Sequence, residues 1–126
     1  MILKVAVAYA ALAGALGVIL GAFGAHGLRD SLEPRLIQTF ETAVQYQLIH
    51  ALALLMVAIL WGQVGRSLAL EISMIAFMAG ILLFSGSLYG LVLTEMRWLG
   101  PVTPLGGLCF IVGWFALLTG GLQKVG

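Results

Sequence analysis

The chain has 126 residues, of which 62% are hydrophobic and only 9% are charged, and its mean hydropathy is +1.13. This composition excludes a soluble globular domain and predicts an integral membrane protein surrounded by lipid. A net charge of +1, without any basic cluster, gives no reason to expect a nucleic-acid partner. The single cysteine, Cys109, cannot form a disulfide within the chain.

Four stretches without charged residues account for most of the chain: 5–28, 42–65, 72–94 and 98–123. Each has about 20 residues or more, which suffices for a helix to cross a hydrocarbon core of roughly 30 Å. The alternation of polar and apolar residues that is typical of membrane barrels is not visible. We therefore predict an all-α fold, a four-helix transmembrane bundle with short loops in one domain, 1–126. The helices are expected over about 4–27, 34–62, 69–93 and 104–123.

The first stretch carries small residues at every fourth position, Ala13, Gly17, Gly21 and Ala25. Such a row lets another backbone approach closely. It predicts either a seam between copies of the chain or ordinary packing inside the bundle, and we expect the latter. The apolar run after Lys4 is longer than the about 7–15 residues of a signal-peptide core, so we expect an uncleaved helix.

The second helix is expected to begin at Glu33 and Pro34, a cap followed by a proline at the first helical position. It would be longer than a membrane requires. Its N-terminal end is therefore extended and lies in or above the headgroups, and Trp61 marks the opposite interface.

Small residues also follow the third and fourth helices. Packing seams are predicted at Gly17, Gly21, Gly86, Gly90, Gly106, Gly113 and Gly120. Cys109 belongs to the same row on the fourth helix and is best explained as a packing residue. A cap and proline at Thr103 and Pro104 predict the start of that helix.

Polar side chains gather in one half of the predicted bundle. On the second helix, one face carries Gln38, Glu41 and Gln45, and the other side carries Thr39, Tyr46, Gln47 and His50. A helix that is polar on both sides cannot face lipid there, so protein, a partner or water must enclose it. The candidate polar pocket comprises His50, Glu41, Gln45, Tyr46, Gln47, Ser85, Ser87, Tyr89 and His26.

Two interpretations of these side chains remain open. In the first they line a polar vestibule, with His50 near the midplane and Glu41 at the mouth, where the two could exchange protons. In the second they form hydrogen bonds between helices and hold the bundle together. No set of metal ligands, no cofactor motif and no known catalytic motif is recognisable, so an enzyme is not favoured.

The orientation in the membrane is not decided by the positive charges, because three lie on each side of the predicted bundle. The free amino terminus and the acidic residues on the other side lead us to expect both termini in the cytoplasm.

Several segments resemble a known family: 21–28 (GAFGAHGL), 40–54 (FETAVQYQLIHALAL), 83–89 (LFSGSLY), 103–107 (TPLGG) and 113–114 (GW). They are similar to the small bacterial inner-membrane proteins called domain of unknown function 423, which are similar to transmembrane protein 256. The resemblance covers nearly the whole chain. It implies a four-helix, multi-pass protein of the bacterial inner membrane, and it implies no catalytic residues.

Two functions from different classes follow. The first is a structural or accessory membrane component that associates with itself or joins a larger membrane complex. The alternative is a small-solute, ion or proton pathway, or a protein that binds lipid or a small ligand, with its pocket around His50. The first is preferred, because the other half of the bundle offers no polar path across the membrane.

Overall fold

The computed structural model describes residues 1–125, and it contains four helical segments that are long and apolar enough to cross a membrane. The segments are Ile2–Leu28, Pro34–Val64, Leu68–Thr94 and Arg97–Val125, with 27, 31, 27 and 29 residues. Each therefore exceeds the about 20 residues that a hydrocarbon core requires. The prediction of an all-α, four-helix membrane fold is confirmed, and the second segment is the longest.

The four segments are built from eight elements in chain order. These are α1 (Ile2–Phe23), η1 (Gly24–Leu28), α2 (Pro34–Val64), α3 (Leu68–Gly80), η2 (Ile81–Ser85), α4 (Gly86–Thr94), η3 (Arg97–Leu99) and α5 (Val102–Val125). Both η1 and η2 are single π-helical turns that continue the preceding helix, and η3 is a 3₁₀ turn. The last helix thus begins at Val102, earlier than the predicted start at residue 104.

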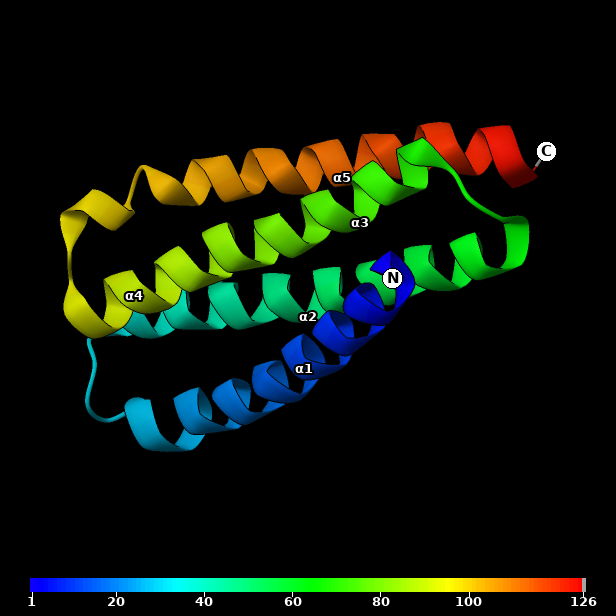
Figure 1. Cartoon of the computed structure of the whole chain (residues 1–126). Coiled ribbons are helices and arrows are strands. Elements are labelled where there is room, and N and C mark those ends of the chain that lie inside the picture. Colours follow the sequence, from blue (N-terminus) through cyan, green and yellow to red (C-terminus); the bar gives the residue numbers. More distant parts are fainter. Residues whose placement is uncertain (126) are drawn as a thin grey trace.

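The helices form an open arrangement in which α2 and the third segment (α3, η2 and α4) occupy the middle (Figure 1). α1 packs against α2, and α5 packs against α3 and η2. Within residues 1–125, no Cα atom of α1 lies within 8 Å of one in α5. Both termini lie toward the same end of the bundle (Figure 1). The two outer helices therefore expose wide faces to the surroundings.

Local chemistry explains where the long helices begin and end. Pro34 occupies the first turn of α2, where its missing N–H costs nothing, although the Glu33 side chain makes no capping bond. Gly65 ends α2 at φ 91°, a conformation that favours glycine. The Ser67 hydroxyl then accepts a hydrogen bond from the Leu70 N–H and starts α3.

Glycines make close contacts between helices inside the chain. A Cβ at Gly113 would lie 2.5 Å from the Phe77 ring, and one at Gly106 would collide with the backbone of Phe84. Gly17 and Gly21 likewise face α2. The seam glycines of α1 and α5 therefore serve packing within one copy.

Two of the predicted seam positions on α4 behave differently. Gly86 has no atom within 4 Å of the position that its Cβ would take, so it faces open space. Gly90 lies against Leu99 of the following turn, within the same hairpin. Gly86 therefore makes no close contact between helices, in contrast to its predicted packing role.

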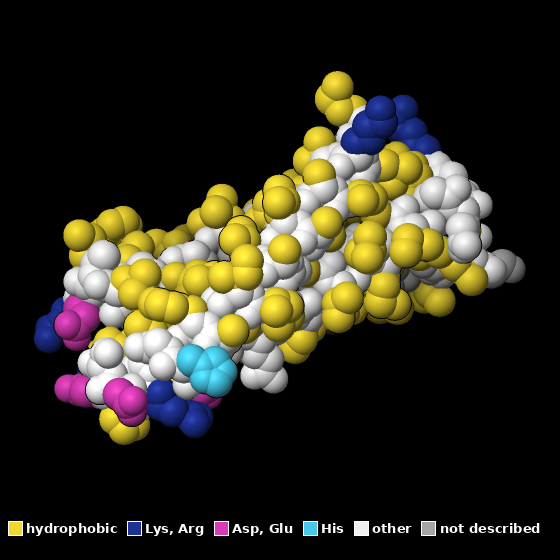
Figure 2. Space-filling view, turned by 90° about the horizontal axis from the view of Figure 1, so that it is seen from below, with side chains coloured by type: hydrophobic (Ala, Val, Ile, Leu, Met, Phe, Trp, Pro, Cys, Tyr) yellow, Lys and Arg dark blue, Asp and Glu magenta, His cyan; other side chains and the backbone are white. Residues whose placement is uncertain are grey.

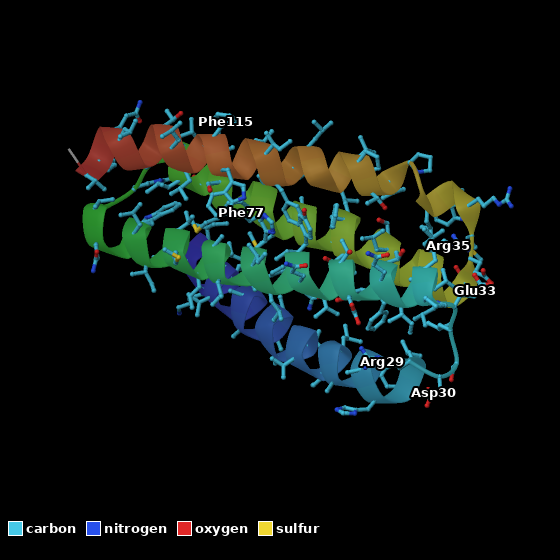
Figure 3. All side chains as sticks on the ribbon, turned by 180° about the vertical axis from the view of Figure 1, so that it is seen from behind. Arg29, Asp30, Glu33, Arg35, Phe77 and Phe115 are labelled. Carbon is cyan, nitrogen blue, oxygen red and sulfur yellow. The ribbon has the colours of Figure 1, made fainter. Side chains whose placement is uncertain are left out.

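Charged side chains gather at the two ends of the molecule, and hydrophobic side chains cover the surface between them (Figure 2). Arg29, Asp30, Glu33 and Arg35 lie together at one end, whereas Phe77 and Phe115 lie far from it (Figure 3). The distribution matches a bilayer with a hydrocarbon core between two polar surfaces.

Candidate functional site

α2 carries two buried polar side chains, and they form the centre of the candidate site. Gln47 and His50 are each 4% exposed, and their spacing of three residues places them on neighbouring parts of one face. A polar group enclosed in a membrane bundle requires a hydrogen-bond partner. Within residues 1–125, no buried side-chain nitrogen or oxygen lacks one.

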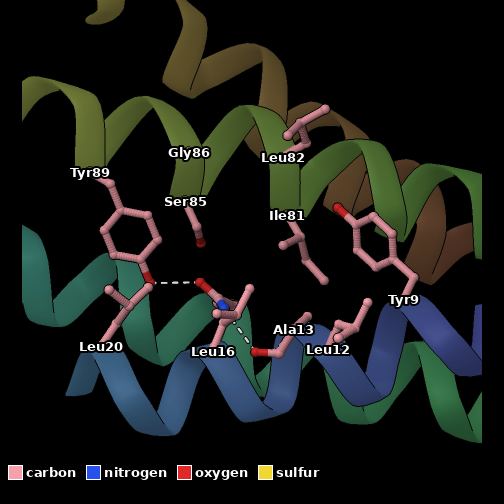
Figure 4. Close-up of a pocket in the computed structure, with 11 residues that line it drawn as sticks. Tyr9, Leu12, Ala13, Leu16, Leu20, Ile81, Leu82, Ser85, Gly86 and Tyr89 are labelled. Carbon is pink, nitrogen blue, oxygen red and sulfur yellow. Dashed lines mark hydrogen bonds between the residues drawn. The ribbon is translucent and has the colours of Figure 1, made fainter. Parts of the chain in front are cut away.

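Gln47 joins three helices through both ends of its amide. The Tyr89 hydroxyl donates to its Oε1 at 2.6 Å, and its Nε2 donates to the Ala13 carbonyl oxygen at 2.7 Å (Figure 4). α1 can come this close because Gly17 lacks a side chain, and a Cβ there would lie 2.5 Å from Cδ2 of Leu48. The glutamine therefore links α4, α2 and α1.

Both ring nitrogens of His50 are engaged. Nδ1 lies 2.8 Å from the Tyr46 carbonyl oxygen, and Nε2 lies 3.0 Å from Nε1 of Trp114. A carbonyl can only accept and an indole N–H can only donate, so Nδ1 carries the proton and Nε2 is the acceptor. His50 is therefore held as the neutral Nδ1–H tautomer, with no ring nitrogen left for a substrate, a proton or a metal ion.

Aromatic rings fix the orientation of this imidazole. The Phe110 ring stacks on it with centroids 3.6 Å apart at an interplanar angle of 10°, and Phe77 and Trp114 lie at 5.6 and 5.8 Å. Phe110 reaches this position over Gly80, where a Cβ would collide with the ring. The glycine of α3 thus makes room for the ring that holds the histidine.

The predicted hydroxyl residues of the third segment point in three directions. Ser85 donates to the Ala43 carbonyl oxygen at 2.7 Å and so bonds to α2. Ser87 donates to its own helix at Phe84 and lies 2.5 Å from the Thr103 hydroxyl of α5. Tyr89 reaches Gln47, as described above. We call the side chains that bond inside the bundle the inner polar layer; they are Gln47, His50, Ser85, Ser87 and Tyr89.

The other predicted pocket residues lie outside this layer. Glu41, Gln45 and His26 are exposed, and Tyr46 is 39% exposed with its ring 4.7 Å from that of Phe84. The structure therefore does not bring the nine side chains into one vestibule. The reason is that the two polar sides of α2 point in different directions, and the chain covers only one of them.

Glu41 makes no ion pair within residues 1–125. Among the described residues, the ion pair is between Arg35 and Glu33, 3.7 Å apart and largely exposed. Exposed pairs of this kind contribute little to stability.

A lateral groove of about 380 Å³ does exist beside the inner polar layer (Figure 4). It lies between α1 and the η2–α4 segment, and α2 forms its floor through Gln47. Its lining is almost entirely apolar and consists of Tyr9, Leu12, Ala13, Leu16, Leu20, Gln47, Ile81, Leu82, Ser85, Gly86 and Tyr89. The open space at Gly86 belongs to this groove.

Four polar side chains that form hydrogen bonds between helices were not in the predicted pocket: Tyr9, Ser73, Thr103 and Trp114. The Tyr9 hydroxyl donates to the Met78 carbonyl oxygen at 2.6 Å, and Ser73 donates to that of Gly113 at 2.8 Å. Trp114 had a usable signal in the sequence. It stands in the middle of its span rather than at an interface, where its N–H must find a partner inside the protein.

The chemistry open to this arrangement is limited. In the described part of the chain, no three metal-ligating side chains come together. The carbonyl, amide and hydroxyl partners of the layer connect helices to one another. As folded, the layer acts as a set of interhelical bonds and not as an open polar cavity.

The amino-acid sequence is similar to those of known membrane proteins. The family model described as "Protein of unknown function (DUF423)" matches residues 20–107. A UPF0382 membrane protein of Staphylococcus epidermidis is 40% identical over 124 residues, 98% of this chain and 100% of the relative. UPF0382 membrane protein YwdK of Bacillus subtilis is 40% identical over 121 residues, 96% and 98% of the two chains. A UPF0382 membrane protein of Haemophilus influenzae is 39% identical over 114 residues, which are 90% of this chain and 90% of the relative. No solved structure matches the chain.

Proposed function

The chain belongs to the DUF423 family of unknown function, its relatives are named as membrane proteins, and it has four helices long enough to span a membrane. On this basis we propose that it is a structural or accessory component of the bacterial inner membrane. It works through contacts within the bilayer, either with further copies of itself or with a larger membrane complex. Lipid is its surrounding medium.

The observation that carries this proposal is the saturation of the inner polar layer. Gln47 is bonded at both ends of its amide, and His50 is bonded through both ring nitrogens. A proton or solute pathway needs groups that can exchange partners as the cargo passes. Stable bonds between helices instead favour a rigid body that presents fixed surfaces.

The experiment is a measurement of particle mass after gentle extraction into lipid nanodiscs at native expression level. We expect particles that contain more than one 13.3 kDa chain, or this chain together with another membrane protein. Particles with a single chain and no other protein would overturn the proposal.

The lateral groove favours a second candidate, a protein that binds a lipid or another apolar small ligand. The groove offers about 380 Å³ of apolar space beside the Gln47 amide. Gly86→Leu would place a side chain in the groove, because Gly86 lines it and nothing lies within 4 Å of its Cβ position. Gly107→Leu is the matched control, since Gly107 is equally open and does not line the groove. Native mass spectrometry should then show a bound lipid on the wild type and Gly107→Leu, and its loss from Gly86→Leu. Equal retention by all three excludes the groove.

Both termini are proposed to face the cytoplasm. They lie toward the same end of the bundle (Figure 1), so one reporter decides for both. A fluorescent protein that folds only in the cytoplasm, fused to the C-terminus, should be bright, whereas activity of a periplasm-dependent phosphatase in the same position would reverse the orientation.

A further inference from the structure

One face of α2 carries a continuous row of exposed side chains. We call it the α2 outer stripe; it consists of Gln38, Glu41, Gln45, Ile49, Leu52, Met56, Ile59 and Gln63. Their spacings of three and four residues keep them in one line along the helix. The opposite face of α2 is buried in the chain, with Leu54 fully enclosed. The stripe is therefore exposed along the whole span, and near its C-terminal end Met56, Ile59 and Gln63 border a hollow beside Leu117 of α5.

Part of the stripe is polar at the depth of the hydrocarbon. Ile49 is the middle residue of α2 and lies almost midway between Arg35 and Arg66, which flank the span. At about 1.5 Å per residue, Gln45 lies about 6 Å and Glu41 about 12 Å from that middle. The hydrocarbon core extends about 15 Å to each side of the midplane. With the midplane placed at the level of Ile49, Gln45 and Glu41 both lie within this depth.

These side chains have no partner in their own copy. Within residues 1–125, Gln38, Glu41 and Gln45 make no side-chain hydrogen bond and no ion pair, whereas Gln47, two positions from Gln45, is bonded at both ends. Lipid tails offer no hydrogen bonds, so an outward amide at this depth calls for another protein surface.

The outward faces of the outer helices differ from this one. α5 exposes Leu105, Leu108, Phe115, Leu118 and Leu122. Its exposed Thr119 hydroxyl is already bonded to the Phe115 carbonyl oxygen. α1 exposes Leu12, Leu16, Val18 and Ile19. Apolar faces of this kind can contact lipid directly. Among these helices, it is therefore α2 whose exposed polar side chains require a protein partner.

We propose that the α2 outer stripe binds the same stripe of a second copy around a two-fold axis along the membrane normal. The inference rests on the proposed function and names the partner and the surface of that self-association. Copies inserted in the same orientation bring Gln45 to the same depth. An amide both donates and accepts, so it is complementary to itself.

The arrangement of charge around the helix fits this pairing. At about 100° per residue, Gln38 and Gln45 lie within about 20° of one another, whereas Glu41 lies about 40° to one side of Gln45. The two carboxylates therefore flank the axis, and each can accept hydrogen bonds from the amides of the other copy. Ile49, Leu52 and Met56 continue the contact toward the other leaflet with side chains 44%, 64% and 68% exposed in the single copy.

The test is cysteine cross-linking in native membranes, with the native Cys109 replaced by alanine. Leu52→Cys and Met56→Cys lie on the stripe. Phe115→Cys is the control, since Phe115 is also 64% exposed but lies on α5. Oxidation should give a species of twice the chain mass for the two stripe variants and leave the control monomeric. Adding Gln45→Leu to Leu52→Cys should lower the yield about threefold or more, the change that corresponds to loss of one interhelical hydrogen bond in a bilayer.

The outcomes separate this interface from the broader function. Cross-linking of the stripe variants no greater than that of Phe115→Cys, or only to a different protein, overturns the pairing. If the nanodisc particle still contains several chains, another surface joins them and the proposed function stands. If the particle holds a single chain and nothing else, both fail. A Gln45→Leu chain that unfolds more easily in monomeric form would also contradict the exposed position assigned to Gln45.

Discussion

Replacing Tyr89 by phenylalanine is expected to destabilise the bundle by removing one hydrogen bond between helices. Its hydroxyl donates to Oε1 of Gln47 at 2.6 Å, and the phenylalanine ring retains the shape of the side chain. The amide oxygen then loses its partner in a position that is 4% exposed. Tyr46→Phe is the matched control, because the Tyr46 hydroxyl makes no hydrogen bond within residues 1–125 and its ring is 39% exposed.

The magnitude follows from the number of bonds. Interhelical hydrogen bonds in membrane proteins average about 0.6 kcal/mol and reach about 1.7 kcal/mol. Tyr89→Phe should therefore lower the free energy of unfolding by about 0.6–1.7 kcal/mol. Gln47→Leu breaks two bonds, at 2.6 and 2.7 Å, and should lower it by about 1–3 kcal/mol. In the double variant Tyr89→Phe/Gln47→Leu, the bond between the two side chains is lost only once, although each single variant also loses it. The coupling energy of this double-mutant cycle should therefore be about 0.6–1.7 kcal/mol.

Reversible unfolding in mixed detergent micelles measures the free energy of unfolding of the wild type, the two single variants and the double variant. The variants should be compared at the same detergent ratio, with helicity confirmed by circular dichroism. A coupling energy below about 0.3 kcal/mol, which is within the scatter of additive pairs, would refute the assigned bond. So would a Tyr46→Phe variant that loses as much stability as Tyr89→Phe.

Two further predictions concern the glycines and His50. Gly106→Ala should lower the free energy of unfolding by about 1–3 kcal/mol, because its Cβ meets the backbone of Phe84, whereas Gly107→Ala has open space and should be neutral or gain up to about 1 kcal/mol from helix propensity. Equal stability of the two variants would contradict the α5–η2 contact. Nitrogen NMR of His50 should show the Nδ1–H tautomer, and Trp114→Phe should remove the donor to Nε2 and cost about 1 kcal/mol. A protonated Nε2 in the wild type would exclude the assigned pair.

The four spans could be predicted because the bilayer imposes their length and polarity. Any helix between Lys4 and Arg29, or between Glu71 and Glu95, must keep its charges outside about 30 Å of hydrocarbon. Pro34 likewise predicted the start of α2 from its own backbone chemistry. The π-helical turns at 24–28 and 81–85 could not be predicted, since their sequences carry no distinct signal. Gly86 follows the second of these turns and faces open space, where a packing contact was predicted.

The sequence predicted which residues belong to the candidate site, but it did not decide between an open vestibule and hydrogen bonds between helices. Gln47, His50, Ser85, Ser87 and Tyr89 do lie inside the bundle, where each makes a hydrogen bond. Whether they formed an open vestibule or a closed network depended on partners that lie far away in the chain. Ala13 and Trp114, separated by about a hundred residues, bond to positions three residues apart on α2.

The sequence by itself determined that this chain crosses a membrane four times, and that α2 is polar on two sides. Helix periodicity also determined that Gln45 and Gln47 point in different directions. Only the tertiary structure decided which of the two faces inward, because lipid is as apolar as the core and leaves no simple contrast between inside and outside. The packing of α1 and α4 around Gln47 satisfied one polar side of α2 and left the other uncovered.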